Sequence, residues 1–333
     1  MSASTFRTHR PAGPATGTRT APAGPAGRTA SEGLPYPSLT TTVPKEFVHR
    51  ASIAEVLLTD WARLAEDRFT VTAQWPRGHS FYTSVHSCHD PLMAAETFRQ
   101  AGVLLAHTEL GVPLGHQLLV RDLGVHLHPE HLTVTGVPAT VELTMTATDV
   151  RTRAGVLTSC RYDAAIRRDG HPIGTAYGTV TCMAPTTYRR IRTPHTSHTP
   201  HTPLPLTAPL APQLVGRSSP KDVVLSPTHH PDRWRLRVDR THPILFDHPL
   251  DHVPGMLLLE AARQSTTATL GHTTLPLHID STFTRYVELD TPCTIHTTHH
   301  TTPTGHHTVT VTAHQADQTA FHCTITPHTT PTP

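Results

Sequence analysis

A polar pattern, Glu-x-x-Arg-Gln, occurs twice in this chain, each time within a run of residues that is otherwise apolar. The first copy spans residues 96–100 and the second spans residues 260–264. Residues three and four positions apart share one face of a helix, so each copy predicts a short polar stripe on a buried helix. The same stripe in both halves of the chain predicts an internally duplicated fold with one polar cluster in each half.

Start and stop signals flank both helices. Asp90 can cap the first helix, Pro91 suits its first turn and Gly111 can end it, which predicts a helix over residues 92–110. The second helix is expected over residues 253–270, again with a proline near its start and a glycine after its end. A helix of about twenty residues is roughly 30 Å long, so other elements must wrap around its apolar faces.

Strand patterns, in which apolar and polar residues alternate, follow each helix. After the first helix we expect strands at residues 117–127, 139–150, 156–167 and 173–183, and after the second at residues 278–289, 293–301, 307–314 and 319–326. Earlier in each half, strands are expected at residues 68–75 and 234–240, and a capping box predicts a short helix at residues 52–55. A long helix followed by an antiparallel meander, present twice, predicts an α+β fold.

Composition predicts how the chain is divided. Residues 1–44 are rich in Pro, Gly, Ala, Thr and Arg and lack apolar periodicity, which is typical of a disordered arm. After it we expect a first domain at residues 45–185, a His-, Thr- and Pro-rich linker without helix or strand at 186–218, a second domain at 219–327 and a disordered tail at 328–333.

Charge and cysteine usage bear on the class of protein. Lys plus Arg total 27 and Asp plus Glu total 25, and a formal charge of +2 argues against a nucleic-acid binder. The five cysteines are scattered and form no CxxC pair, which predicts reduced thiols and a cytoplasmic protein. No run reaches the roughly 18 apolar residues that a membrane helix needs. Many of the 29 histidines lie in Thr- and Pro-rich tracts, so no metal site is predicted.

Each polar stripe has a structural and a functional interpretation. The structural one is an ion pair between Glu and Arg that joins the helix to its neighbour. The functional one is a carboxylate among apolar residues whose raised pKa suits a general base. On the functional interpretation the candidate catalytic residues are Glu260 and Glu96, and the candidate substrate-binding residues of the stripes are Arg99, Gln100 and Gln264.

The loop before the second helix, FDHPLDHVPGM at residues 246–256, is the most specific segment of the chain. Pro254 and Gly255 would let a ligand approach the free N–H groups at the start of the helix, which can polarise a thioester carbonyl. We therefore include Gly255 among the substrate-binding candidates, together with His248 and His252. A loop histidine beside an aspartate is also often only a hydrogen-bonded structural residue.

This loop and the following helix resemble the active-site segment of the β-hydroxyacyl-carrier-protein dehydratases, hot-dog proteins that pair a loop His with a Glu on the central helix. The loop from His248 to Glu260 is shorter than in those dehydratases, which weakens the inference of dehydration. The resemblance to the A-factor biosynthesis hot-dog family is closer and covers about residues 45–325. It is carried by the segments at residues 43–45, 48–50, 89–91, 116–117 and 246–264, and by Trp61.

The resemblance implies a tandem hot-dog fold and an acyltransferase. By position it makes Glu96 and Glu260 the two central-helix carboxylates and Arg263 the basic residue beside the second, so Arg263 is a third candidate catalytic residue. The implied reaction moves a β-ketoacyl group from acyl carrier protein to the hydroxyl of dihydroxyacetone phosphate, a step toward γ-butyrolactone autoregulators. It implies no metal and no redox cofactor, since the phosphopantetheine is delivered by the carrier protein substrate. It also implies no nucleic-acid or membrane partner, and a monomer or homodimer. A basic docking patch for the acidic carrier protein is expected among Arg189, Arg190, Arg192, Arg217 and Lys221.

Two alternatives remain open from the sequence. One is a hot-dog thioesterase or dehydratase that acts on acyl-carrier-protein thioesters and needs no phosphorylated acceptor. The other is a non-catalytic sensor that only binds an acyl ligand.

Overall fold

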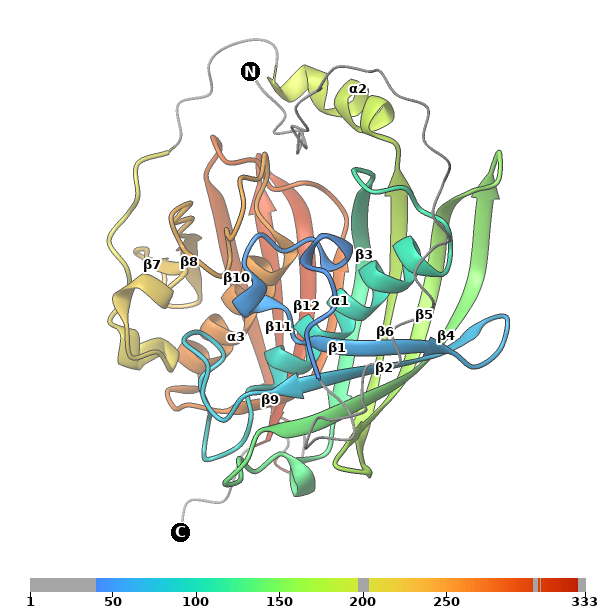
Figure 1. Cartoon of the computed structure of the whole chain (residues 1–333). Helices are drawn as coiled ribbons and strands as arrows, with labels where there is room; N and C mark the ends of the chain where they lie inside the picture. The colour runs from blue at the N-terminus through green and yellow to red at the C-terminus, as the bar shows by residue number, and fades with distance from the viewer. Residues whose placement is uncertain (1–39, 197–203, 302–304, 306, 329–333) are drawn as a thin grey trace, which may run out of the picture. The chain divides into compact units, whose positions relative to one another are not determined.

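The computed structural model describes residues 40–196, 204–301, 305 and 307–328 (Figure 1). Most of the predicted N-terminal arm, residues 197–203 of the predicted linker and residues 329–333 of the predicted tail lie outside these ranges. The predictions of disorder for those segments therefore stay predictions.

Both predicted long helices are confirmed. Helix α1 (Pro91–Thr108) begins after Asp90, whose side chain accepts a hydrogen bond from the Leu92 amide. Helix α3 (Gly255–Leu270) begins after Pro254, which has no side-chain capping bond, and ends at a left-handed glycine. The two helices therefore differ at their N-termini although their polar stripes have the same letters.

The strands come in two sets. The first half contributes β1 (Leu58–Arg63), β2 (Arg68–Trp75), β3 (Gln117–Leu127), β4 (Ala139–Arg153), β5 (Val156–Arg168) and β6 (His171–Met183). The second half contributes β7 (Leu225–Pro227), β8 (Arg233–Leu236), β9 (Leu275–Phe283), β10 (Cys293–Thr301), β11 (His307–Gln315) and β12 (Gln318–His328). Short 3₁₀ helices are η1 (Lys45–Val48), η2 (Ile53–Glu55), η3 (Pro129–His131), η4 (Pro212–Val215) and η5 (Pro220–Asp222).

All of these strands pair in one antiparallel 12-stranded sheet, in the order β1-β2-β4-β5-β6-β3-β9-β12-β11-β10-β8-β7. The halves meet at β3 and β9, where Gly124 lies opposite Asp280. Figure 1 shows α1 and α3 lying against this sheet. Two 3₁₀ helices, two strands, a long helix and four further strands occur in the same order in each half, apart from the extra η3, so the fold is an α+β tandem hot dog.

Several predictions of local structure were wrong. The predicted linker contains a helix, α2 (Pro185–Thr196), because side chains of that helix bond to the second half. Strand β9 ends at Phe283, well before residue 289, and Ser52 makes no side-chain capping bond to η2. None of the described helices is long and apolar enough to cross a membrane.

Candidate active site

The polar stripe of α1 is a buried ion cluster around Glu96. The Glu96 carboxylate is 1% exposed and lies 2.6 Å from Arg50 Nη2. It also accepts hydrogen bonds from Arg99 Nε at 2.8 Å and from Gln100 Nε2 at 2.7 Å. Gln100 in turn accepts from the Leu57 amide, which fixes the stripe to the start of β1. The predicted pair of Glu and Arg on α1 is therefore present, with a second arginine added.

The polar stripe of α3 repeats this arrangement around Glu260. Its carboxylate is fully buried and lies 2.7 Å from Arg217 Nη2. Arg263 Nε donates to it at 3.0 Å, and Gln264 also donates. Gln264 accepts from the Val224 amide, as Gln100 does from Leu57 in the first half. The duplication predicted from the sequence therefore extends to individual hydrogen bonds.

The sequence analysis missed the roles of Arg50 and Arg217. Each follows a 3₁₀ helix and a residue in the left-handed region, which is His49 with φ 51° in the first half and Gly216 with φ 67° in the second. The two segments read PKEFVHR and PQLVGR, so a Pro before a Val-x-Arg recurs. That repeat is the sequence signal that could have identified the two arginines. The expectation that Arg217 belongs to a surface patch is therefore wrong.

Both carboxylates have a lowered pKa, so the predicted raised pKa of a general base is wrong for Glu96 and Glu260. Burial acts to raise the pKa of Glu96, but Arg50 and Arg99 outweigh it and lower that pKa to about 2. Arg217 and Arg263 do the same for Glu260, whose pKa is also about 2. Both groups are therefore ionised at neutral pH and act as anchors for arginines.

One arginine of each cluster also bonds to the other half of the chain. Arg50 Nη1 donates to the Ile244 carbonyl at 3.1 Å, and Arg217 Nη1 donates to the Phe81 carbonyl. The two loops that supply these carbonyls are themselves held by His79 and His242, whose Nδ1 atoms accept backbone N–H groups two and three residues later. Each cluster is therefore tied to the other half of the chain through one of its arginines.

The two clusters differ in their access to a cavity of about 420 Å³. The predicted site residues Arg99, His248, His252 and Gly255 line it, together with Arg50 and Asp247. The predicted residues Glu96, Gln100, Glu260, Arg263 and Gln264 do not. The first cluster therefore reaches the cavity through its arginines, and the second stays closed in the protein interior.

Asp247 and His248 form a hydrogen-bonded pair on the cavity wall. His248 Nδ1 lies 2.6 Å from Asp247 Oδ1, and the Ala51 amide donates to Asp247 Oδ2 at 2.8 Å. Burial acts to raise the pKa of Asp247, but the bond from His248 and the nearby Arg50 lower it. An ionised Asp247 favours the tautomer with the proton on Nδ1, in which Nε2 is the acceptor atom of the ring. The His248 side chain is 34% exposed, and its Nε2 has no partner among the described residues.

His252 lies on the same cavity wall but is tied to α2. Its Nδ1 lies 2.7 Å from Asp251 Oδ1, and Tyr188 on α2 donates to the same carboxylate oxygen at 2.7 Å. Arg192, also on α2, is 3% exposed and pairs with Asp251 and Glu288. His252 therefore connects the helix of the predicted linker to the cavity.

The basic patch predicted to dock the carrier protein is wrong in part. The side chains of Arg192 and Arg217 are buried in ion pairs, so neither forms a surface patch. Arg189, Arg190 and Lys221 are exposed as expected.

The N-terminus of α3 opens into the cavity, since Pro254, Gly255 and Met256 all line it. Pro254 provides no side-chain cap, so the first N–H groups of the helix remain available to a ligand. A Cβ added at Gly255 would lie 3.2 Å from Cε1 of Phe283. A side chain at this position would therefore press on Phe283, which would have to shift by a few tenths of an ångström.

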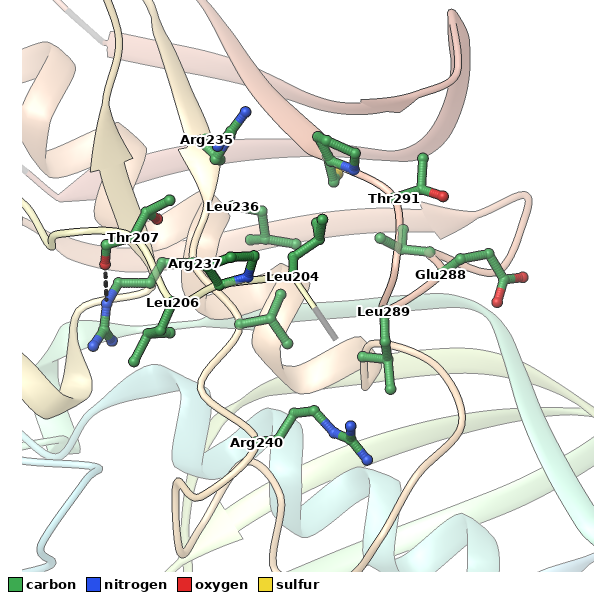
Figure 2. A pocket seen from close by; sticks show the side chains of 15 residues that line it. Leu204, Leu206, Thr207, Arg235, Leu236, Arg237, Arg240, Glu288, Leu289 and Thr291 are labelled. Atoms are coloured by element: carbon green, nitrogen blue, oxygen red, sulfur yellow. Dashed lines mark hydrogen bonds between the residues drawn. The ribbon is translucent and has the colours of Figure 1, made fainter. Parts of the chain in front are cut away.

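A second cavity lies beside β8 and measures about 140 Å³ (Figure 2). It is lined largely by apolar residues such as Leu204, Leu206 and Leu236, and Arg237 donates to the Thr207 carbonyl at its edge (Figure 2). None of the predicted site residues lines this cavity. Across the residues that the structure describes, no group of three or more His, Cys, Asp or Glu could hold a metal ion.

Comparison with known proteins agrees with the geometry. The A-factor biosynthesis hotdog domain matches residues 35–184 and again residues 198–331. A 2-oxo-3-(phosphooxy)propyl 3-oxoalkanoate synthase of Streptomyces virginiae is 47% identical over 289 residues, which cover 86% of this chain and 98% of that protein. A protein of the same name from Streptomyces coelicolor is 41% identical over 258 residues, covering 77% of this chain and 82% of its own length.

Among solved structures, a putative oleoyl thioesterase from Lactobacillus plantarum is similar to this chain, with a TM-score of 0.48 and 14% sequence identity. The match covers 79% of this chain and 97% of that one. The duplicated fold, the paired clusters and the two matched segments agree with one another. This chain belongs to the A-factor biosynthesis hotdog family.

Proposed function

We propose that this chain transfers a 3-oxoacyl group from a thioester to the free hydroxyl of dihydroxyacetone phosphate. The product named for its relatives, a 2-oxo-3-(phosphooxy)propyl 3-oxoalkanoate, is the ester of those two parts. The observation that carries the proposal is that one cavity is lined by an arginine for a phosphate, a histidine for a hydroxyl proton and an open helix N-terminus for a carbonyl.

The acyl thioester occupies the apolar part of the cavity, beside residues such as Phe98, Leu118 and Met256. Its carbonyl oxygen lies at the N-terminus of α3, where the N–H groups of Gly255 and Met256 donate hydrogen bonds to it. These donors and the helix dipole stabilise the negative charge that develops on this oxygen. Removing one such donor costs about 10²–10³ in rate in enzymes where this has been measured.

The phosphorylated acceptor binds beside Arg99. Nε and Nη2 of Arg99 are bonded to Glu96, and Nη1 has no partner among the described residues. A guanidinium held at one edge presents its other edge in a fixed direction, which suits a phosphate. In this proposal Glu96 positions Arg99 and Arg50 and does not touch the substrate.

His248 is the general base. Its Nε2 takes the proton from the acceptor hydroxyl while the hydroxyl oxygen bonds to the thioester carbonyl carbon. When the C–S bond breaks, the same proton returns to the departing thiolate, so the products are the ester and a free thiol. Asp247 holds the ring and stabilises its protonated form, as a carboxylate does in related acid–base pairs.

The thioester is delivered by the phosphopantetheine of an acyl carrier protein in the cytoplasm, and the chain works as a monomer or homodimer. Acyl transfer of this kind needs no metal or redox cofactor. Glu260 and Arg263 form a structural cluster in this proposal and not part of the reacting site, because neither lines the cavity.

The test is to incubate the purified protein with a 3-oxoacyl thioester and dihydroxyacetone phosphate and to follow products by mass spectrometry. We expect a phosphorylated ester that forms only when the acceptor is present. Free acid formed without acceptor would indicate a thioesterase, and an enoyl product would indicate a dehydratase. Acyl binding without turnover would indicate a sensor and would overturn the proposal.

A further inference from the structure

The mouth of the 420 Å³ cavity carries a local positive charge. Among the residues that line the cavity, those exposed to solvent are Arg121, Ile191, Thr284 and Arg285. The two carboxylates on its wall are Asp122, which faces Arg161 at 3.7 Å, and Asp247, which is bonded to His248. Neither arginine at the mouth has a hydrogen-bond or ion-pair partner for its side chain among the described residues.

The backbone brings these two arginines to the same end of one strand pair. Arg121 lies in β3 beside Asp122, which is opposite Thr282 of β9, and Arg285 is the second residue after the end of β9. The pairing of β3 with β6 shifts register between Val120 and Asp122, so Arg121 is an extra residue in that ladder. A bulge of this kind redirects the side chain that it carries.

A second irregularity occurs at Arg285. The amides of Thr284 and Arg285 both donate to the Ala320 carbonyl, at 2.9 and 3.3 Å, so two residues face one on β12. Phe283, two residues earlier, packs against Gly255 at the start of α3. The local backbone therefore joins Arg285 to the wall where the thioester carbonyl is proposed to bind.

We infer that Arg121 and Arg285 bind the phosphate of the phosphopantetheine arm that carries the acyl group. This inference rests on the proposed function, since it assigns the mouth of the same cavity to the carrier part of the thioester. Two unpaired guanidinium groups beside an apolar cavity suit a ligand that is apolar at one end and anionic at the other. The phosphate of coenzyme A and that of an acyl carrier protein offer the same chemistry.

The decisive measurement is calorimetric binding of 4′-phosphopantetheine and of pantetheine, which lacks the phosphate, because it needs no turnover. We expect the wild-type protein to bind the phosphorylated arm about tenfold more tightly, equivalent to about 1.4 kcal/mol. In a variant carrying R121Q and R285Q the two ligands should bind equally, at the wild-type affinity for pantetheine. Arg153→Gln, at the exposed hairpin between β4 and β5, should leave the tenfold preference unchanged.

Equal binding of both ligands to the wild-type protein would overturn the inference, as would a double variant that keeps the preference. A rise in KM for dihydroxyacetone phosphate, with unchanged binding of 4′-phosphopantetheine, would also overturn it, because the arginines would then serve the acceptor. Failure of ester formation with an intact tenfold preference would contradict the proposed function but not the phosphate site. Parallel binding measurements with acyl-coenzyme A and acyl carrier protein then identify the source, which is the carrier that the wild-type protein binds more tightly and for which the double variant loses affinity.

Discussion

Replacing Glu260 with Gln should destabilise the protein severely, although the side chain touches no substrate. Glu260 is fully buried and forms ion pairs with both Arg217 and Arg263, whose side chains are each 2% exposed. Removing one member of a buried ion cluster leaves uncompensated charge and typically costs about 3–5 kcal/mol. That is a large part of the roughly 5–15 kcal/mol by which native domains are stable.

Glu96→Gln is the matched control, because the two carboxylates have the same helix position and the same kinds of partner. Arg99 is 18% exposed and reaches the cavity, so it can turn toward water when its carboxylate is lost. The expected loss is therefore smaller, about 1.5–3 kcal/mol, as for hydrogen bonds to a charged group. At roughly 2 °C per kcal/mol, E260Q should melt about 6–10 °C below wild type, and E96Q about 3–6 °C below it.

The assay is thermal unfolding, followed by ester formation at a temperature where both variants remain folded. We expect E260Q to keep most of its activity at that temperature and E96Q to lose activity because Arg99 is no longer positioned. The reasoning is refuted if E260Q melts like wild type while its folded form has no activity. That result would restore the sequence-based assignment of Glu260 as the catalytic base.

Three further outcomes follow from the same contacts. Burial, with help from His107 and Arg99, lowers the pKa of His49 to about 3. The contribution of His49 to stability is therefore complete above pH 6.5 and is lost as pH falls toward 3. In H49Q the free energy of unfolding, measured by denaturant titration, should vary less over that pH range. Gly255→Ala should lower kcat, because the new Cβ meets Phe283 at 3.2 Å, and adding F283L should restore much of it; no recovery would contradict the steric cause. Arg99→Gln should raise KM for dihydroxyacetone phosphate about tenfold or more with little effect on KM for the thioester, and an equal rise in both would contradict the assigned contact.

The sequence predicted the elements whose signals are local. The cap at Asp90 and an apolar run define α1, an apolar run and a terminal glycine define α3, and the repeated stripe predicts the duplication. Helix α2 could not be predicted in the same way, because bonds from Tyr188 and Arg192 to residues far along the chain stabilise it.

The site was only partly predictable for a related reason. Arg99 and Arg263 occupy the same place in identical letters, yet only Arg99 lines the cavity, and that difference depends on the elements packed around each helix. Arg50 and Arg217 meet their carboxylates through contacts between distant parts of the chain, which no local pattern reports. The loop with Asp247 and His248, singled out from the sequence, lines the cavity, but its hydrogen-bond geometry required the structure.

The most direct test of the account compares His248→Asn with His252→Asn in the rate of ester formation at saturating thioester and acceptor. Both histidines line the same cavity and pair with a neighbouring aspartate, so the two variants are closely matched. The account predicts that H248N loses a factor of about 10²–10⁴ in kcat, the usual contribution of a general base, while H252N stays within a few-fold of wild type. Comparable kcat in H248N and wild type, or an equal loss in both variants, would contradict the assignment of His248 as the base.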